Sequence, residues 1–218
     1  MAEISTRAVA TAAGGAVLAV ALAFVGKADA SHQYDRTVRC NGQTVRQVQL
    51  VTRSSEGVVF RKLRPGPGGR RVSVAYGCLL RAGRVTRLDY ANRVAHPQLA
   101  GRYVGFGRTL YVSEFGSASG IAVVDLKTGK SVVSEEGVPG TDGDSHLLSL
   151  VVKRNGSVAW TGMPDGPDVS VWKIDATAQG PQRLDVGPQI DAESLRLSAD
   201  RRSVGWRNGP EQRSAPLD

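Results

Sequence analysis

The stretch Leu-Arg-Leu-Ser-Ala-Asp-Arg-Arg-Ser-Val-Gly-Trp, residues 195–206, decides the fold of this chain. It opens with apolar and charged residues in alternation, continues through Ser, Asp and Arg, and ends on strand-forming Val204 and Trp206. Alternation with a period of two is typical of a β-strand with one buried face. A short polar cluster between two such runs indicates a tight turn. The stretch therefore predicts strand, turn and strand.

The same pattern occurs four times. A valine, a small or apolar residue and an aromatic residue follow a turn-forming cluster in each copy, and the aromatic residues are spaced 46, 54 and 46 residues apart. A second strand pair is predicted in the two middle units, beginning with residues 121–126 and 169–174. We expect the repeated aromatic residues to be core positions, and Asn155-Gly156 to form a type I′ turn. The repeated aromatic residues are Phe60, Phe106, Trp160 and Trp206.

A period in the forties with about four strands is the length of a β-propeller blade. Residues 195–206, together with residues 123–130, resemble the degenerate blades of TolB-like and WD40-like β-propellers. The chain as a whole resembles exported bacterial repeat proteins built from such units. The resemblance covers most of residues 46–218 and implies a propeller-like fold of about four blades, but no particular activity. The Gly-His and Trp-Asp pairs of WD40 repeats are absent from the sequence.

The last unit is short, because only twelve residues follow Trp206. Closure of a four-bladed ring would need an N-terminal strand, from residues 37–40 or 44–51, to complete the final blade. Without closure, the edges of the sheets stay open. A two-sheet β-sandwich is the main alternative fold.

The first thirty residues have the pattern of an export signal. Arg7 precedes an uncharged run over residues 8–26, and Ala28-Asp29-Ala30 places small residues where a signal peptidase cleaves. The uncharged run is also long enough to span a bilayer, so an uncleaved membrane anchor is the alternative. The sequence thus predicts residues 1–30 as signal peptide or anchor, residues 31–218 as an all-β repeat domain, and an extracytoplasmic location.

The chain carries a net charge of +8, and the basic surplus lies near its beginning. Residues 31–95 hold thirteen Lys and Arg against three Asp and Glu, whereas residues 96–218 hold thirteen against fifteen. Such a basic field attracts anionic partners. An exported protein does not meet nucleic acid, so we expect anionic envelope components or another exported protein; a solvated face that aids solubility is the plainer alternative. The basic candidates are Arg61, Lys62, Arg64, Arg70 and Arg71.

The two cysteines, Cys40 and Cys78, are an even number in a chain with an export signal. This combination predicts one disulfide bond. Neither cysteine has a second cysteine or a histidine at metal-ligand spacing, so a metal site is not expected there.

The remaining motif fragments do not predict catalysis. Ser170 and Lys173 match the S-x-x-K motif of penicillin-binding enzymes, but in a strand their side chains point to opposite faces. Asp142 and Asp144 stand two residues apart, as carboxylates in calcium loops often do, and form a weak calcium candidate. A solvated acidic loop is the plainer alternative. We expect no catalytic residue and no cofactor.

These observations favour an exported, non-catalytic binding domain or envelope-associated scaffold, without identifying its ligand. The alternative is a secreted hydrolase or lyase with its site at the propeller channel. An enzyme should gather polar and acidic side chains in one concave pocket, whereas a scaffold should present a shallow basic or aromatic surface.

Overall fold

The computed structural model describes residues 34–111, 117–135, 146–163, 167–178 and 180–218. The predicted export segment of residues 1–30 and the calcium candidates Asp142 and Asp144 lie outside the described residues. In the part of the chain that is described, no helix has the length and apolar character needed to cross a bilayer.

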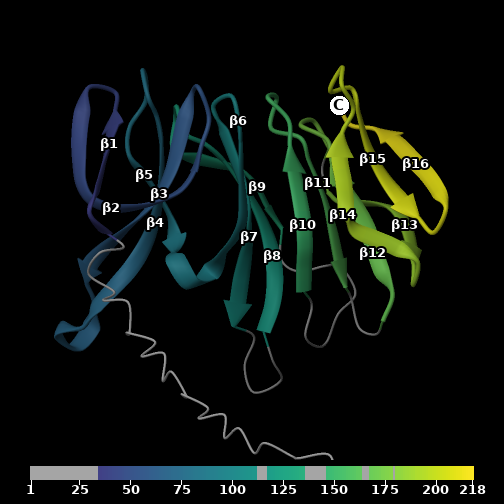
Figure 1. Cartoon of the computed structure of the whole chain (residues 1–218), viewed down its shortest axis with the longest axis horizontal. Helices are drawn as coiled ribbons and strands as arrows, with labels where there is room; N and C mark the ends of the chain where they lie inside the picture. Colours follow the sequence, from purple (N-terminus) through teal and green to yellow (C-terminus); the bar gives the residue numbers. More distant parts are fainter. Residues whose placement is uncertain (1–33, 112–116, 136–145, 164–166, 179) are drawn as a thin grey trace, which may run out of the picture.

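Four antiparallel sheets follow one another along the chain (Figure 1). Sheet A contains β1 (Arg36–Cys40), β2 (Gln43–Arg53), β3 (Gly57–Pro65), β4 (Arg71–Leu79) and β5 (Thr86–Tyr90). Sheet B contains β6 (Val94–Ala100), β7 (Tyr103–Tyr111), β8 (Ser117–Asp125) and β9 (Lys130–Glu135). Sheet C contains β10 (His146–Val152), β11 (Val158–Met163), β12 (Val169–Ile174) and β13 (Gln182–Gly187). Sheet D contains β14 (Ile190–Leu197), β15 (Ser203–Asn208) and β16 (Glu211–Pro216).

Each predicted repeat unit lies in one of these sheets. The predicted turn joins two neighbouring strands, and the repeated aromatic residue stands on the second of them. These residues are Phe60 on β3, Phe106 on β7, Trp160 on β11 and Trp206 on β15, and at most 3% of any of them is exposed. The prediction that they are core residues is therefore confirmed. The chain forms four sheets in sequence rather than the two of a sandwich.

The sheets pack in chain order, with an apolar core between each sheet and the next (Figure 1). In sheets B, C and D the repeated aromatic residue faces the preceding sheet. Phe106 lies in the core between sheets A and B, Trp160 in the core between B and C, and Trp206 in the core between C and D. Trp160 also lies parallel to Trp172 on β12, with ring centroids 6.5 Å apart. Burial of each ring contributes on the order of 3 kcal/mol.

Phe60 has no preceding sheet to contact, and β1 takes that place. Cys40 on β1 and Cys78 on β4 form the predicted disulfide, with their Cα atoms 5.8 Å apart. Two strands lie between β1 and β4 in the sheet order. In a flat sheet this would separate them by about 14 Å, since neighbouring strands are about 4.8 Å apart. Sheet A therefore curls, so that β1 and β2 enclose a core that contains Phe60, Val38 and Val48.

The condition for ring closure, an N-terminal strand that completes the last sheet, is not met in the described structure. Residues 37–40 and 44–51 belong to β1 and β2 of sheet A, where β1 pairs with β2. Sheet D instead ends the stack with a polar face. Arg196, Gly205 and Ser214 stand opposite one another on its three strands, and the Arg196 guanidinium donates a hydrogen bond to Gln212. A polar outer face needs no further sheet to cover it.

A half-buried carboxylate connects sheet C to sheet D. Asp185 on β13 accepts hydrogen bonds from Trp206 Nε1 at 2.7 Å and from Asn208 Nδ2 at 3.2 Å, and pairs with Arg213 on β16 at 2.9 Å. Burial raises the pKa of the Asp185 carboxyl. The hydrogen bonds from Trp206, Asn208 and the Val186 amide, together with the Arg213 charge, outweigh it and hold this pKa below its ordinary value.

Removal of the disulfide should lower the stability of the protein by a measurable amount. Replacement of both Cys40 and Cys78 by Ser should lower the free energy of unfolding by about 4 kcal/mol, because the bond closes a long loop in the unfolded chain. Urea titration of the wild type and the double variant measures this difference. An intact mass that shows two free thiols in the native protein, or equal stability of the two proteins, would contradict the assignment.

Asp185→Asn should destabilise the protein by about 1–3 kcal/mol at neutral pH, because it removes the charge from a half-buried group that accepts several hydrogen bonds. A carboxyl with a lowered pKa stabilises the fold above its unfolded pKa of about 3.9 and loses that contribution as the pH falls through the folded pKa. The stability gap between wild type and variant should therefore narrow towards about pH 3. Urea midpoints at both pH values test this. Exposed Glu193→Gln is the control, for which we expect little change at either pH.

Candidate functional site

The five basic candidates lie on one hairpin of sheet A, which we call the basic hairpin (residues 61–71). It consists of the far ends of β3 and β4 joined by a 3-10 turn, η2 (Pro67–Gly69). The Gly66 amide donates a hydrogen bond to the Arg70 carbonyl at 2.7 Å and closes the loop. Figure 1 shows this end of sheet A projecting downward, away from the β2–β3 turn. The five basic residues, which were grouped because they are close together in the sequence, thus also lie on one hairpin in the structure.

The basic side chains are distributed over both faces of the hairpin. Arg61 stands opposite Ala75, which belongs to the core between sheets A and B. Lys62 stands opposite Val48 and therefore shares the other face. Arg64 is on the same side as Lys62, and its guanidinium lies over the Tyr76 ring and donates a hydrogen bond to the Tyr76 hydroxyl at 3.1 Å. The feature is therefore a basic projection rather than a flat patch.

Among the described residues, none of the five basic side chains forms an ion pair. Arg64, Arg70 and Arg71 are exposed, and Arg61 and Lys62 are half-buried. Like charges gathered on one hairpin repel one another unless anions lie nearby. The basic hairpin therefore has both the charge and the exposure needed to bind an anionic surface.

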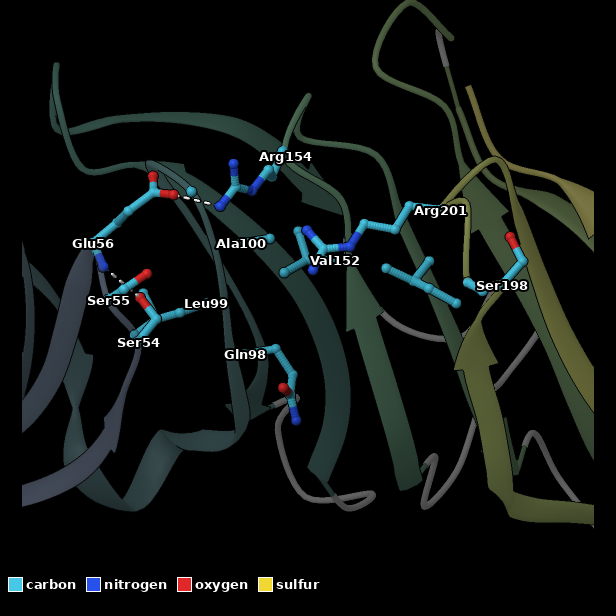
Figure 2. A pocket seen from close by; sticks show the side chains of 13 residues that line it. Ser54, Ser55, Glu56, Gln98, Leu99, Ala100, Val152, Arg154, Ser198 and Arg201 are labelled. Carbon is cyan, nitrogen blue, oxygen red and sulfur yellow. Dashed lines mark hydrogen bonds and ion pairs between the residues drawn. The ribbon is translucent and has the colours of Figure 1, made fainter.

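A cleft of about 550 Å³ lies at the opposite end of the sheets. Its lining comes from one turn and the adjoining strand ends of each of the four sheets, and we call it the four-turn cleft (Figure 2). Its apolar lining includes Leu99, Val152 and Leu197. Its charged and polar lining consists of Ser54, Ser55, Glu56, Gln98, Arg154, Ser198 and Arg201. The volume is in the range of small-molecule sites.

An ion pair crosses one side of the cleft. Glu56 in the β2–β3 turn pairs with Arg154 in the β10–β11 turn (Figure 2). Gly101 lies between them in the β6–β7 turn, with a φ of +60°. A Cβ at this position would meet Arg154 Cγ at 3.3 Å and Glu56 Oε2 at 3.5 Å. Glycine therefore provides both the left-handed turn and the space in which the two side chains meet.

The turn in sheet C differs from its prediction. The Gly156 amide donates a hydrogen bond to the Lys153 carbonyl, and Gly156 has a φ of +99°. Asn155 is not among the residues with positive φ, which a type I′ turn would require of it. The connection is a turn followed by a left-handed glycine, a common form of longer hairpin loop. The type I′ prediction for Asn155-Gly156 is therefore wrong, although the turn itself is present.

The turn in sheet D repeats this geometry with an arginine. The Arg201 amide donates a hydrogen bond to the Ser198 carbonyl at 2.9 Å, and Arg201 has a φ of +59°. Asp200 Oδ1 fixes the turn by accepting hydrogen bonds from Ser198 Oγ at 2.6 Å and from the Arg202 amide at 3.0 Å. The Ser198 hydroxyl first, and then the Arg202 amide, lower the pKa of the Asp200 carboxyl.

The sequence did not identify the four-turn cleft, although each of its four turns was predicted. The chain order gives no indication that turns about 50 residues apart share one edge of the molecule. Trp160, Trp172 and Trp206 are at most 7% exposed and lie in cores, so they do not present an aromatic surface to a ligand. Among the described residues, no group of three or more His, Cys, Asp and Glu side chains is arranged to hold a metal ion.

In comparisons with known proteins, no protein-family model matches the chain, and no curated protein matches it either.

Gly101 offers a test of the turn that separates Glu56 from Arg154. Gly101→Ala should lower the free energy of unfolding by about 1 kcal/mol or more, because it places a Cβ at positive φ against the Arg154 side chain. Gly180→Ala is the matched control, since a Cβ there would meet nothing within 4 Å and its φ is not positive. Urea unfolding of both variants measures the difference, and equal effects would contradict the geometry of this turn.

Proposed function

We propose that this chain is an exported, non-catalytic binding domain that attaches to an anionic component of the cell envelope through the basic hairpin. The observation that carries the proposal is the projection of five cationic side chains, none with an ion-pair partner in the described structure. The Cys40–Cys78 disulfide supports the extracytoplasmic location, because such bonds persist in oxidising compartments. The four stacked sheets support a propeller-like scaffold of four units.

The position of Tyr34 supports attachment through the basic hairpin. Its hydroxyl lies 2.9 Å from Ser73 Oγ, and Ser73 stands opposite Leu63 on the basic hairpin. The described chain therefore begins beside this hairpin. If residues 8–26 remain as an anchor, residues 27–33 connect it to the domain over at most about 25 Å. The basic hairpin would then be held close to the membrane surface.

The four-turn cleft supports binding over hydrolysis. Among the described residues, Glu56 is the one carboxylate in the lining, and its charge is paired with that of Arg154. General acid and base catalysis by carboxylates requires a group free to accept or deliver a proton at the substrate. The remaining polar lining is Ser, Gln and Arg, which suits recognition of a bound group.

The experiment compares the full-length chain with two variants of equal charge. The first replaces the five basic-hairpin residues with Gln, and the second replaces exposed basic residues of other sheets. We expect the first to lose at least about tenfold in affinity for vesicles that contain phosphatidylglycerol, and the second to lose much less, because each basic group near an anionic surface contributes about 1 kcal/mol. The control substitutions to Gln are at Lys127, Lys130, Arg183, Arg196 and Arg202.

Co-sedimentation at rising salt measures the affinity, which should fall steeply as the charges are screened. All three proteins share residues 1–33, so any contribution of that segment cancels in the comparison. Polyphosphate serves as a second probe; a hairpin-dependent effect confined to it would assign the partner to a phosphate polymer instead of lipid. Equal binding by both variants to both probes would refute the proposal.

A further inference from the structure

Arg201 is the unengaged charge of the four-turn cleft. Among the described residues it has no ion pair and no side-chain hydrogen bond, whereas Arg154 is paired with Glu56. Figure 2 shows its side chain extending from the β14–β15 turn across the cleft towards Val152. Because Glu56 and Arg154 neutralise one another, the cleft carries the equivalent of one positive charge, located on Arg201.

The backbone at Arg201 adds a second, independent observation. Arg201 holds a φ of +59°, a conformation that side chains with a Cβ rarely adopt. In the corresponding turn of sheet C the residue at this place is Gly156. Sheet D thus uses an arginine where glycine would fit the backbone better. Strained residues of this kind cluster at binding and catalytic sites, where the surrounding structure holds them in place.

The turn around Arg201 supplies that support. Ser198 Oγ donates a hydrogen bond to Asp200 Oδ1, and the Ser203 amide donates one to Ser198 Oγ at 3.0 Å. These contacts fix the backbone on both sides of Arg201 before any ligand arrives. A guanidinium presented from a fixed backbone loses less conformational entropy on binding than one on a mobile loop.

The floor beside Arg201 is apolar. Val152 is 4% exposed, and Leu99, Ala100 and Leu197 are half-buried around it. The side chains of Gln98 and Ser55 also line the cleft and have no hydrogen-bond partner in the described structure. The cleft therefore combines one cation, two free polar groups and an apolar surface, the composition of a small-ligand site.

We propose that the four-turn cleft binds a small organic carboxylate, with the carboxylate on the Arg201 guanidinium and a short apolar body on Leu99, Val152 and Leu197. The planar guanidinium matches a carboxylate in a two-point hydrogen-bonded pair. The single uncompensated charge favours a monoanion over a phosphate dianion. This site is separate from the basic hairpin, so the two proposals stand or fall independently.

The test uses hexanoate as the probe and follows backbone amide shifts of the full-length protein by NMR. We expect saturable shifts in the four turns that line the cleft. Arg201→Gly should weaken hexanoate binding at least about tenfold, the equivalent of one lost charged hydrogen bond. It should also fold at least as well as the wild type, since glycine suits the positive φ. Arg202→Gln, an exposed neighbour outside the cleft lining, is the matched control and should bind like the wild type.

Two further probes separate the parts of the proposal. Hexanol keeps the apolar body without the charge, and inorganic phosphate keeps a negative charge without the apolar body; both should bind more weakly than hexanoate. Equal hexanoate binding by Arg201→Gly, no shifts in the cleft of the wild type, or phosphate binding as tight as hexanoate would each overturn the assignment. Arg201→Gly should still bind anionic vesicles like the wild type, which distinguishes a failure here from a failure of the basic-hairpin proposal.

Discussion

A stack of β-sheets must cover the apolar faces of its members, and this constraint explains most of the structure. Three of the four repeated aromatic residues, Phe106, Trp160 and Trp206, face the sheet before their own, so each of these units needs a predecessor. Phe60, in the first sheet, lacks one. The chain supplies a substitute by curling β1 and β2 over this face and fixing β1 through the Cys40–Cys78 bond. At the other end, Arg196 and Ser214 make the outer face of sheet D polar.

The same packing places the two candidate binding surfaces at opposite ends of the strands. Because successive units enter the stack in the same direction, one turn from each sheet lies at the same edge, and these four turns form the four-turn cleft (Figure 1). They are the β2–β3, β6–β7, β10–β11 and β14–β15 turns. β3 begins at this edge and ends at the basic hairpin, so the two candidate surfaces lie at opposite ends of one strand. A protein attached to an anionic surface by the hairpin would therefore present the cleft away from that surface. Turns that are held in place by a rigid scaffold are common binding sites.

Much of the fold followed from local patterns, whereas the candidate sites followed only in part. Trp206 and its three counterparts were predicted to be buried because strand alternation and turn residues act over a few positions. The sequence left the pairing of β1 open, since a strand at the N-terminus can join either end of a stack and the pattern of its own residues does not distinguish the two. Asn155 shows an error of prediction within a single turn. The Asn-Gly pair predicted a turn, but the length of the loop selected a different type.

The sequence by itself determined the four strand-turn-strand units, their buried aromatic residues, the disulfide partners and the local concentration of basic residues. These features depend on residues close together in the chain or, for the two cysteines, on their number. Only the tertiary structure decided that β1 covers sheet A, that Arg61 and Lys62 face opposite ways, and that Glu56, Arg154 and Arg201 share one cleft. The physical reason is that such arrangements depend on how whole sheets pack, and sheet packing is set by faces assembled from residues far apart in the chain.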